Sequence, residues 1–286
     1  MKKHQRKYEL TKETRIRRGH VLHRIRAVTS FDDVREGDLG GYIERESNLS
    51  HEGNCWIYDD AEAYGFATIY GNAKVYGRAK VYGRAKVYGD AKICCFAEVY
   101  GRIKVYDFTI IEDHAEVCGN AHSRNRGEIF GHARISDGAK IGGSIRIYNH
   151  AKIYGSAVVT DHAEIYGLAE IHGCAEVYGH AKVFGTAEVL GGARICGRAK
   201  IYENAKIYDN AKIYENAEVY GEARVSGGAN VYGKSRVYDF AEVYGNADVY
   251  GEAIVCDHAE VYLHAKVNSD TVLDGVEKVY SYPLDV

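Results

Sequence analysis

Residues 73–93 read AKVYGRAKVYGRAKVYGDAKI, and this stretch decides the fold. A six-residue phrase repeats here with almost no change, and the same period continues far beyond the quoted segment. Val or Ile occupies 34 of the 36 positions spaced by six from Ile57 to Val267. Ala occupies 30 of the 35 positions that lie two residues earlier, from Ala61 to Ala265. A short repeat sustained in this way is typical of a solenoid.

Each repeat predicts a short strand followed by a sharp corner. Ala and Val lie two residues apart and therefore face the same side of an extended strand, whereas the charged residue between them and the Tyr after them face the other side. Gly, Asn or Asp comes next, and these residues tolerate the positive φ that a corner requires. Such corners are expected at Gly65, Gly71, Gly77, Asp107, Asp113, Asn149 and Asp161. A period of six does not fit the spacing of a helix face.

The pattern resembles the hexapeptide repeat of left-handed parallel β-helices, in which three repeats make one triangular coil. The resemblance implies an all-β, single-domain, left-handed parallel β-helix, a triangular solenoid of about 12 coils with N- and C-terminal caps. We expect a basic N-terminal arm and cap over residues 1–56, the repeats over 57–267 and a C-terminal cap over 268–286. The register holds throughout the repeats, so the sequence predicts one elongated domain without an inserted loop.

Composition limits the class of protein. The net charge of −3 gives no strong nucleic-acid signal, and no apolar run is long enough for a transmembrane helix. The N-terminal residues lack the apolar core of a signal peptide. The cysteines are odd in number, scattered and without a CxxC pair, so we interpret them as reduced thiols of a cytoplasmic protein. They are Cys55, Cys94, Cys95, Cys118, Cys174, Cys196 and Cys256.

Positive charge is concentrated at the N-terminus. Residues 1–29 carry ten Lys and Arg against Glu9 and Glu13, while the remainder of the chain is acidic. Two interpretations stay open: an arm for an acidic partner, or a cap whose charges complement the acidic solenoid. Residues 20–29 are expected to form a strand that covers the first coil. Neither a membrane nor a nucleic acid is expected as a partner.

The segment before the repeats is distinctive. It contains Phe31-Asp32-Asp33-Val34, Gly40-Gly41-Tyr42, Leu49-Ser50 and Gly53-Asn54-Cys55-Trp56-Ile57-Tyr58-Asp59. With these residues the chain resembles the YdcK-like family, bacterial proteins described as acetyltransferases of the hexapeptide-repeat superfamily. The resemblance implies acyl transfer with acetyl-CoA as co-substrate, in a cleft that commonly lies between the subunits of a trimer.

Aromatic residues follow most of the inward Val and Ile positions. At a spacing of 18 they form three columns, which predicts stacked aromatic ladders on the outside of the solenoid. The columns hold Tyr148, Tyr166, Phe184, Tyr202, Tyr220 and Tyr238; Tyr64, Tyr82, Tyr100, Tyr154 and Tyr208; and Tyr70, Tyr88, Tyr106, Tyr178, Tyr214, Tyr232 and Tyr250. The ladders either only stabilise the solenoid or also mediate a homo-oligomer, a trimer or a dimer.

Residues 109–147 break the pattern most. Ser123 replaces an inward aliphatic residue and Gly127 an inward Ala, and the aromatic columns lapse. Places that break a local rule are often functional. His114, His132 and His150 lie 18 apart, so the unbroken register predicts that they share one corner on three successive coils. His122, Arg124 and Arg126 are expected on another face or its corner.

Three interpretations of this patch stay open. In the first, one of His114, His122, His132 or His150 is the base of an acyltransferase. In the second, the patch binds an anion or nucleotide through Ser123, Arg124, Arg126 and Ser136. In the third, it is a drifted stretch without a role. A ladder of His gives at best two ligands to one ion, so no metal site and no bound cofactor are predicted.

The sequence thus leads to a main hypothesis and two alternatives for the whole chain. The main hypothesis is a rigid β-solenoid that binds or scaffolds and self-associates through its Tyr-rich faces. The alternatives are a CoA-dependent acyltransferase with a His base, and an anion or nucleotide sink at residues 109–147. Neither a Walker A loop, a GxSxG elbow nor an HExxH motif is present.

Overall fold

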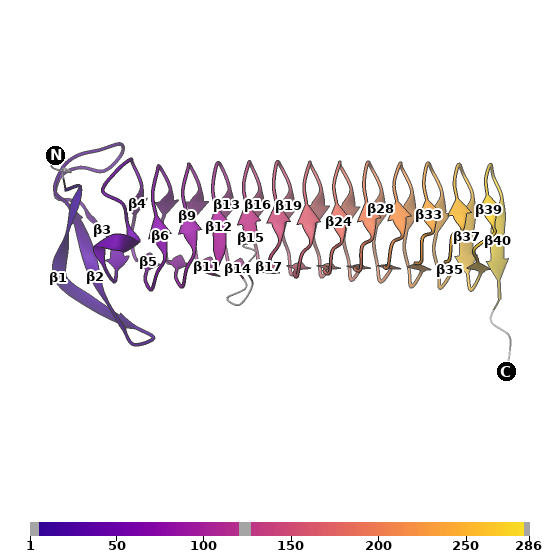
Figure 1. The fold of residues 1–286 in the computed structure, drawn as a ribbon, viewed down its shortest axis with the longest axis horizontal. Coiled ribbons are helices and arrows are strands. Elements are labelled where there is room, and N and C mark those ends of the chain that lie inside the picture. Colours follow the sequence, from indigo (N-terminus) through magenta and orange to yellow (C-terminus); the bar gives the residue numbers. More distant parts are fainter. Residues whose placement is uncertain (1–5, 120–126, 283–286) are drawn as a thin grey trace. The chain divides into compact units, whose positions relative to one another are not determined.

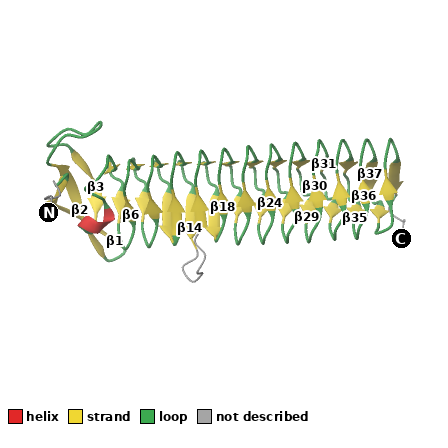
Figure 2. Cartoon of the chain, turned by 45° about the horizontal axis from the view of Figure 1, so that its top comes forward, coloured by secondary structure: helices red, strands yellow, loops and turns green. Residues whose placement is uncertain are grey.

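A computed structural model describes residues 6–119 and 127–282. The described residues form short strands and turns, apart from a single 3-10 turn, η1 (Glu46–Asn48) (Figures 1 and 2). The strands belong to three sheets and make a β-solenoid of about 13 turns, which confirms the predicted all-β solenoid of hexapeptide coils. The chain divides into two compact units, Met1–Ser144 and Ile145–Val286, which are described in turn.

In the first unit the strands are β1 (Tyr8–Arg17), β2 (His20–Ala27), β3 (Leu39–Ile43), β4 (Trp56–Ile57), β5 (Glu62–Ala63), β6 (Thr68–Ile69), β7 (Lys74–Val75), β8 (Lys80–Val81), β9 (Lys86–Val87), β10 (Lys92–Ile93), β11 (Glu98–Gly101), β12 (Ile103–Val105), β13 (Ile110–Ile111), β14 (Glu116–Gly119), β15 (Gly127–Ile129), β16 (Arg134–Ile135) and β17 (Lys140–Gly143). The first sheet of this unit has the order β1-β2-β3-β5-β8-β11-β14-β17. The second has the order β4-β7-β10-β13-β16, and the third β6-β9-β12-β15.

In the second unit the strands are β18 (Arg146–Ile147), β19 (Lys152–Ile153), β20 (Val158–Val159), β21 (Glu164–Ile165), β22 (Glu170–Ile171), β23 (Glu176–Val177), β24 (Lys182–Val183), β25 (Glu188–Val189), β26 (Arg194–Ile195), β27 (Lys200–Ile201), β28 (Lys206–Ile207), β29 (Lys212–Ile213), β30 (Glu218–Val219), β31 (Arg224–Val225), β32 (Asn230–Val231), β33 (Arg236–Val237), β34 (Glu242–Val243), β35 (Asp248–Val249), β36 (Ile254–Val255), β37 (Glu260–Leu263), β38 (Lys266–Val267), β39 (Val272–Leu273) and β40 (Lys278–Ser281). Every third strand joins the same sheet: β20 to β38 the first, β19 to β40 the second and β18 to β39 the third.

The interior is built as the repeat predicts. In the strand around β27, Ala199 and Ile201 are completely buried while Lys200 between them is exposed. Ile201 pairs in register with Val183 on one side and Val219 on the other, so each aliphatic residue packs on its equivalents in the neighbouring coils. Burying one such side chain contributes about 1.5–3 kcal/mol before entropy is subtracted.

The corners have the backbone conformation that the sequence predicts. Every corner residue named above has a positive φ, from 57° at Asp107 to 71° at Gly77. An Asp in this position also bonds to the next coil, since its carboxylate accepts a hydrogen bond from the corner amide above. Gly77 N donates to Asp59 Oδ2 at 2.9 Å, and Gly179 N donates to Asp161 Oδ2 at 3.1 Å. Asp can therefore take the place of Gly at a corner, because its hydrogen bond to the neighbouring coil compensates for the substitution.

The inward exceptions are accommodated locally. Thr109 Oγ1 donates to the Tyr106 carbonyl at 2.7 Å, and Ser235 Oγ donates to the Tyr232 carbonyl at 2.8 Å, so neither buried hydroxyl lacks a partner. Gly127 pairs in register with the buried Ile103, where a small residue leaves room for a large one. These substitutions are therefore explained by packing and hydrogen bonding.

The aromatic ladders are confirmed, and they stack closely. Tyr64, Tyr82 and Tyr100 have centroid separations of 4.9 and 4.8 Å with nearly parallel rings. In the second unit the rings from Tyr148 through Phe184 to Tyr238 stack at 4.7–4.9 Å. Charged side chains between the rings pair across coils in the same way, as in Lys206–Glu188 at 3.0 Å.

The prediction of an unbroken coil length is wrong. Glu98 pairs with Glu116, a separation of 18 residues that recurs along the chain. Glu116, however, pairs with Lys140, and Ile103 pairs with Gly127, both separations of 24. The chain between Gly119 and Gly127 therefore holds six residues more than one coil needs. Because this insertion equals the repeat period, a count in sixes does not detect it.

Because of the insertion, aromatic residues that the sequence predicts in one column lie on different sheets. Tyr64, Tyr82 and Tyr100 follow strands of the first sheet, whereas Tyr154 follows β19 of the second sheet. The prediction that these residues share one column is therefore wrong. The corrected ladder of the third sheet in the first unit runs from Tyr70 through Tyr106 to Phe130, and the last two rings stack at 5.1 Å.

The ends of the chain differ from the coils. At the N-terminal end β1 and β2 form a long antiparallel hairpin, and β2 pairs with β3 (Figure 1). The strand expected over residues 20–29 is thus present. At the other end Leu273 and Val279 keep the register, pairing with Val255 and Val261. In the described part of the chain, no helix has the length and apolarity to cross a membrane.

We predict that Ile201→Ala lowers the free energy of unfolding by about 2–5 kcal/mol, because it leaves a cavity between two tightly paired coils. Lys200→Ala, one position away on the exposed face, should change it by about 1 kcal/mol or less. Urea unfolding followed by far-UV circular dichroism measures both. Similar midpoint shifts for the two variants would contradict an inward Ile201.

Candidate functional site

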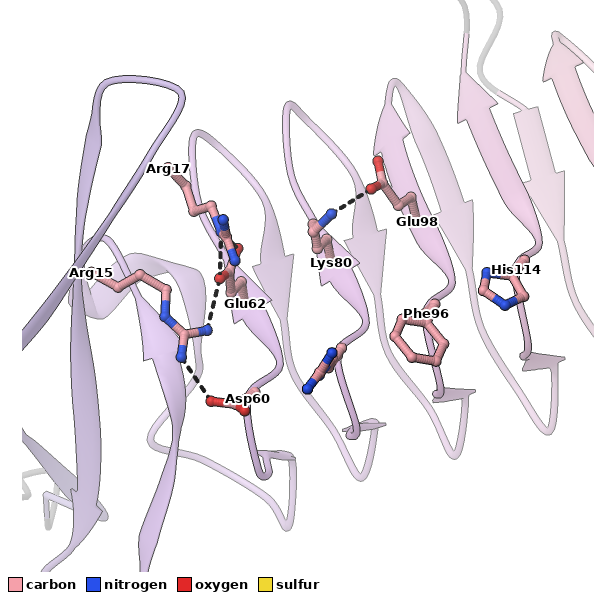
Figure 3. Close-up of a pocket in the computed structure, with 9 residues that line it drawn as sticks. Arg15, Arg17, Asp60, Glu62, Lys80, Phe96, Glu98 and His114 are labelled. Atoms are coloured by element: carbon pink, nitrogen blue, oxygen red, sulfur yellow. Dashed lines mark hydrogen bonds and ion pairs between the residues drawn. The ribbon is translucent and has the colours of Figure 1, made fainter.

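A groove in the first unit is the best-formed candidate site (Figure 3). Its volume is about 690 Å³, and it lies between the N-terminal hairpin and the outside of the solenoid. The lining residues are Arg15, Arg17, Asp60, Glu62, Arg78, Lys80, Phe96, Glu98 and His114. The groove therefore combines four permanent cations, three carboxylates, an aromatic ring and an imidazole.

The coil geometry places most of these side chains in two columns. Asp60, Arg78, Phe96 and His114 follow each other at intervals of 18 along the corner that precedes the first sheet. Glu62, Lys80 and Glu98 are the outward residues that open β5, β8 and β11. The hairpin supplies the opposite wall with Arg15 and Arg17, which lie two residues apart and so face the same side of β1.

A buried carboxylate joins the hairpin to the solenoid. The Glu62 side chain is only 1% exposed and accepts hydrogen bonds from Arg15 at 3.0 Å and Arg17 at 2.8 Å. Arg15 also donates to Asp60 at 2.8 Å and lies over the Tyr42 ring at 4.1 Å. These contacts favour the interpretation that the basic N-terminal residues complement an acidic solenoid.

The middle of the groove holds a second charged pair. Glu98 accepts hydrogen bonds from Lys80 at 2.6 Å and from the Tyr82 hydroxyl at 3.0 Å. Burial acts to raise the pKa of Glu98, but the bonds from Lys80 and Tyr82 outweigh it and lower this pKa below its ordinary value. Glu98 is therefore a stable carboxylate and a poor candidate for a proton donor at neutral pH.

His114 stands at the end of the groove away from the hairpin (Figure 3). Its ring stacks on Phe96 with centroids 4.9 Å apart and planes 7° apart. The Arg78 guanidinium lies over the Phe96 ring, 5.7 Å from its centroid. His114 is exposed, and no described residue donates to or accepts from its ring nitrogens, so the imidazole is oriented by stacking and open to a ligand.

The predicted arrangement of His114, His132 and His150 on one corner is wrong, because the insertion shifts the later coils. His114 stacks on Phe96 before the first sheet, whereas His132 stacks on Phe108 at 4.9 Å before the second sheet. His150 lies in the second unit, and its amide donates to the Gly167 carbonyl.

The structure does not bring Ser136 to the groove. Ser136 follows β16 of the second sheet, and its carbonyl accepts a bond from the Ala139 amide. His122, Ser123, Arg124 and Arg126 lie outside the described residues. Of the predicted residues that the structure describes, His114 alone lines the groove.

Sequence analysis missed the residues from the hairpin and a second oriented imidazole. His172 in the second unit stacks on Tyr154 at 4.7 Å, and its Nε2 lies 2.9 Å from Glu188 Oε1. Hydrogen bonds from His172 and Lys206 lower the pKa of Glu188. The sequence signal that could have identified His172 is a His at a position where most repeats have Tyr.

The second unit has a cavity of comparable size, about 680 Å³, that includes Glu188. Its lining is Lys152, Leu168, Glu170, Thr186, Glu188, Asn204, Lys206 and Glu222. Three carboxylates face two cations there, so the cavity is less suited to an anionic ligand than the groove in the first unit.

The described ranges hold no candidate metal centre and no disulfide. Within residues 6–119 and 127–282, no three His, Cys, Asp or Glu side chains gather in a way that could hold a metal ion. All seven cysteines are free thiols.

Comparison with known proteins gives a distant relationship. No family model matches the chain. It is 44% identical over 71 residues to a protein of Escherichia coli (strain K12) described as uncharacterized acetyltransferase YdcK, and the match spans 22% of each of the two chains. The UDP-N-acetylglucosamine acyltransferase from Campylobacter jejuni matches in structure over 62% of this chain and 71% of that one, with 16% identity and a TM-score of 0.29.

We predict that Glu62→Ala frees the hairpin, because Arg15 and Arg17 lose their shared buried acceptor. Backbone amides of β1 should then exchange with solvent roughly tenfold faster or more in hydrogen-exchange mass spectrometry. Glu9→Ala is the matched control, since Glu9 pairs with Arg26 on the exposed face of the same hairpin. Unchanged exchange in the Glu62 variant would contradict this anchoring role.

Proposed function

We propose that the protein is a CoA-dependent acyltransferase, with the groove beneath the hairpin as its site and His114 as general base. The observation that carries the proposal is an exposed, stacked imidazole at one end of a groove that also holds four cations. The distant similarity to a protein described as an acetyltransferase supports acyl transfer over a purely scaffolding role.

The charges of the groove suit an acyl-CoA, the molecule that would donate the acyl group. An acyl-CoA carries several phosphate charges and a long neutral arm. Arg78 is the cation best placed for a phosphate, because its described contact is with the Phe96 ring and no described carboxylate neutralises it through an ion pair. Phe96 is half exposed and offers an apolar surface to the neutral arm. Phosphate recognition by a guanidinium and packing on an aromatic ring are both favourable.

The reaction needs two proton transfers at His114. A neutral imidazole nitrogen accepts the proton of an acceptor hydroxyl or amine while the acceptor atom attacks the thioester carbonyl carbon. The carbon–sulfur bond breaks, and the CoA thiolate takes a proton from the imidazolium, which restores the base. Stacking on Phe96 would hold the ring in place during both transfers.

The same proposal extends to assembly and compartment. The solenoid exposes large apolar side chains at several corners, among them Phe66, Phe96, Phe108, Leu168 and Phe240. Faces of this kind favour self-association, so we propose a homo-oligomer, a trimer or a dimer. Free thiols and an acyl-CoA substrate support our further proposal that the protein acts in the cytoplasm.

We predict that His114→Ala lowers the rate of acetyl transfer by about 10²–10⁴-fold, because the attacking group loses its base. The assay incubates the full chain with acetyl-CoA and a panel of amines and alcohols, and measures free CoA by chromatography. His172→Ala is the matched control and should keep at least about half of the activity, since His172 lies in the second unit. Loss of activity in the His172 variant alone would place the chemistry there and contradict the proposal.

Light scattering tests the proposed assembly. We expect a solution mass of two or three times the chain mass of 31.8 kDa. A monomer at micromolar concentration would contradict self-association through the outer faces.

A further inference from the structure

A smaller cavity of the first unit is lined by cations and one aromatic ring. Its volume is about 290 Å³, and its lining residues are Phe66, Arg84, Lys86 and Arg102. Phe66, Arg84 and Arg102 follow one another at the corner that leads from the first sheet to the third, and Lys86 opens β9. The groove of the proposed acyltransferase lies at a different corner, between the second sheet and the first.

The cavity differs from the others in its charge. The groove and the cavity of the second unit each include at least one Glu, whereas the described lining of this cavity holds three cations and no carboxylate. The whole chain has a net charge of −3, so general basicity does not explain the cluster. The neighbouring cations are already neutralised, since Lys104 pairs with Glu128 and Arg45 with Glu44. Arg84 and Lys86 therefore give the cavity a positive potential.

Phe66 orients the principal cation. Its side chain is 68% exposed, although an isolated Phe gains nothing from contact with water. The Arg84 guanidinium lies 5.8 Å from the ring centroid and the Arg45 guanidinium 5.5 Å. No described carboxylate forms an ion pair with Arg84. A guanidinium held on an aromatic ring keeps its donors directed outward and loses little further freedom when it binds an anion.

A polar atom without a partner lies next to the cluster. Thr68 pairs in register with Lys86, and its Oγ1 is shielded from solvent without a hydrogen-bond partner among the described residues. Such atoms are uncommon in folded proteins. This hydroxyl lies on the strand next to Lys86.

We propose that Arg84, Lys86 and Arg102 form a binding site for a phosphate-bearing anion, separate from the proposed acyl-transfer groove. The planar guanidiniums match two oxygens of a phosphoryl group each, and the Lys86 ammonium adds a point charge. The size of the cavity matches a phosphate or diphosphate group better than a whole nucleotide. The proposal does not depend on acyl transfer.

Isothermal titration of the full chain at low ionic strength tests this site with pyrophosphate as the probe. Arg84→Gln should weaken pyrophosphate binding roughly tenfold or more, because it removes the oriented guanidinium. Arg198→Gln is the matched control: Arg198 occupies the same corner after β26 in the second unit, and its variant should bind within about twofold of the parent. Circular dichroism confirms that both variants are folded.

Three results would overturn the proposal: no pyrophosphate binding by the parent, equal weakening in both variants, or loss of binding in His114→Ala. The last result would place the anion in the groove instead. Parallel titrations with phosphate and ADP identify the source of the ligand. Equal affinity for pyrophosphate and ADP assigns the site to the phosphates alone, and tighter ADP binding assigns it to a nucleotide; both support the site. Failure of acyl transfer would leave these outcomes unchanged.

Discussion

The structure depends on a narrow interior filled alternately by Ala and by Val or Ile. Because the two inward positions lie two residues apart and a corner follows, the chain turns after each short strand. Every coil then hydrogen-bonds to the next through its backbone, as in the pair Val183↔Ile201. This arrangement fixes the outward residues as strictly as the inward ones, since residues one coil apart lie in contact. The stacked rings of Tyr82 and Tyr100 and the pair Lys80–Glu98 are consequences of that single constraint.

The candidate site arises where this regular lattice is modified. The groove exists because a hairpin that is not part of any coil is held against the first sheet by Glu62, whose buried carboxylate serves two arginines. Opposite this wall the column of Phe96 and His114 presents an oriented imidazole. The small basic cavity uses the same device on another corner, where Phe66 positions Arg84. In each case one aromatic ring of a column sets the plane of the polar group stacked on it.

Much of the fold was predictable from residue spacing, and the site was predictable only in part. The inward faces, the corners at residues such as Asp107, and the ladders follow from alternation and period alone. The six extra residues between Gly119 and Gly127 were not predictable, because an insertion as long as the repeat preserves the spacing by six. That error misplaced His132 relative to His114. The contact of Arg15 with Asp60 could not be predicted from the repeat either, because the hairpin has no periodic relation to the coil that it covers.

The shift in coil length decides which residues follow His114 in its column, and cross-linking measures the shift directly. In the structure Lys104 and Glu128, 24 residues apart, are neighbours on β12 and β15. Lys104→Cys/Glu128→Cys should therefore form an intramolecular disulfide on mild oxidation, detected by peptide mass spectrometry. Ile110→Cys/Glu128→Cys, in which the cysteines are 18 residues apart, should not. A disulfide in the second variant and none in the first would contradict the register, and with it the separation of His132 from His114.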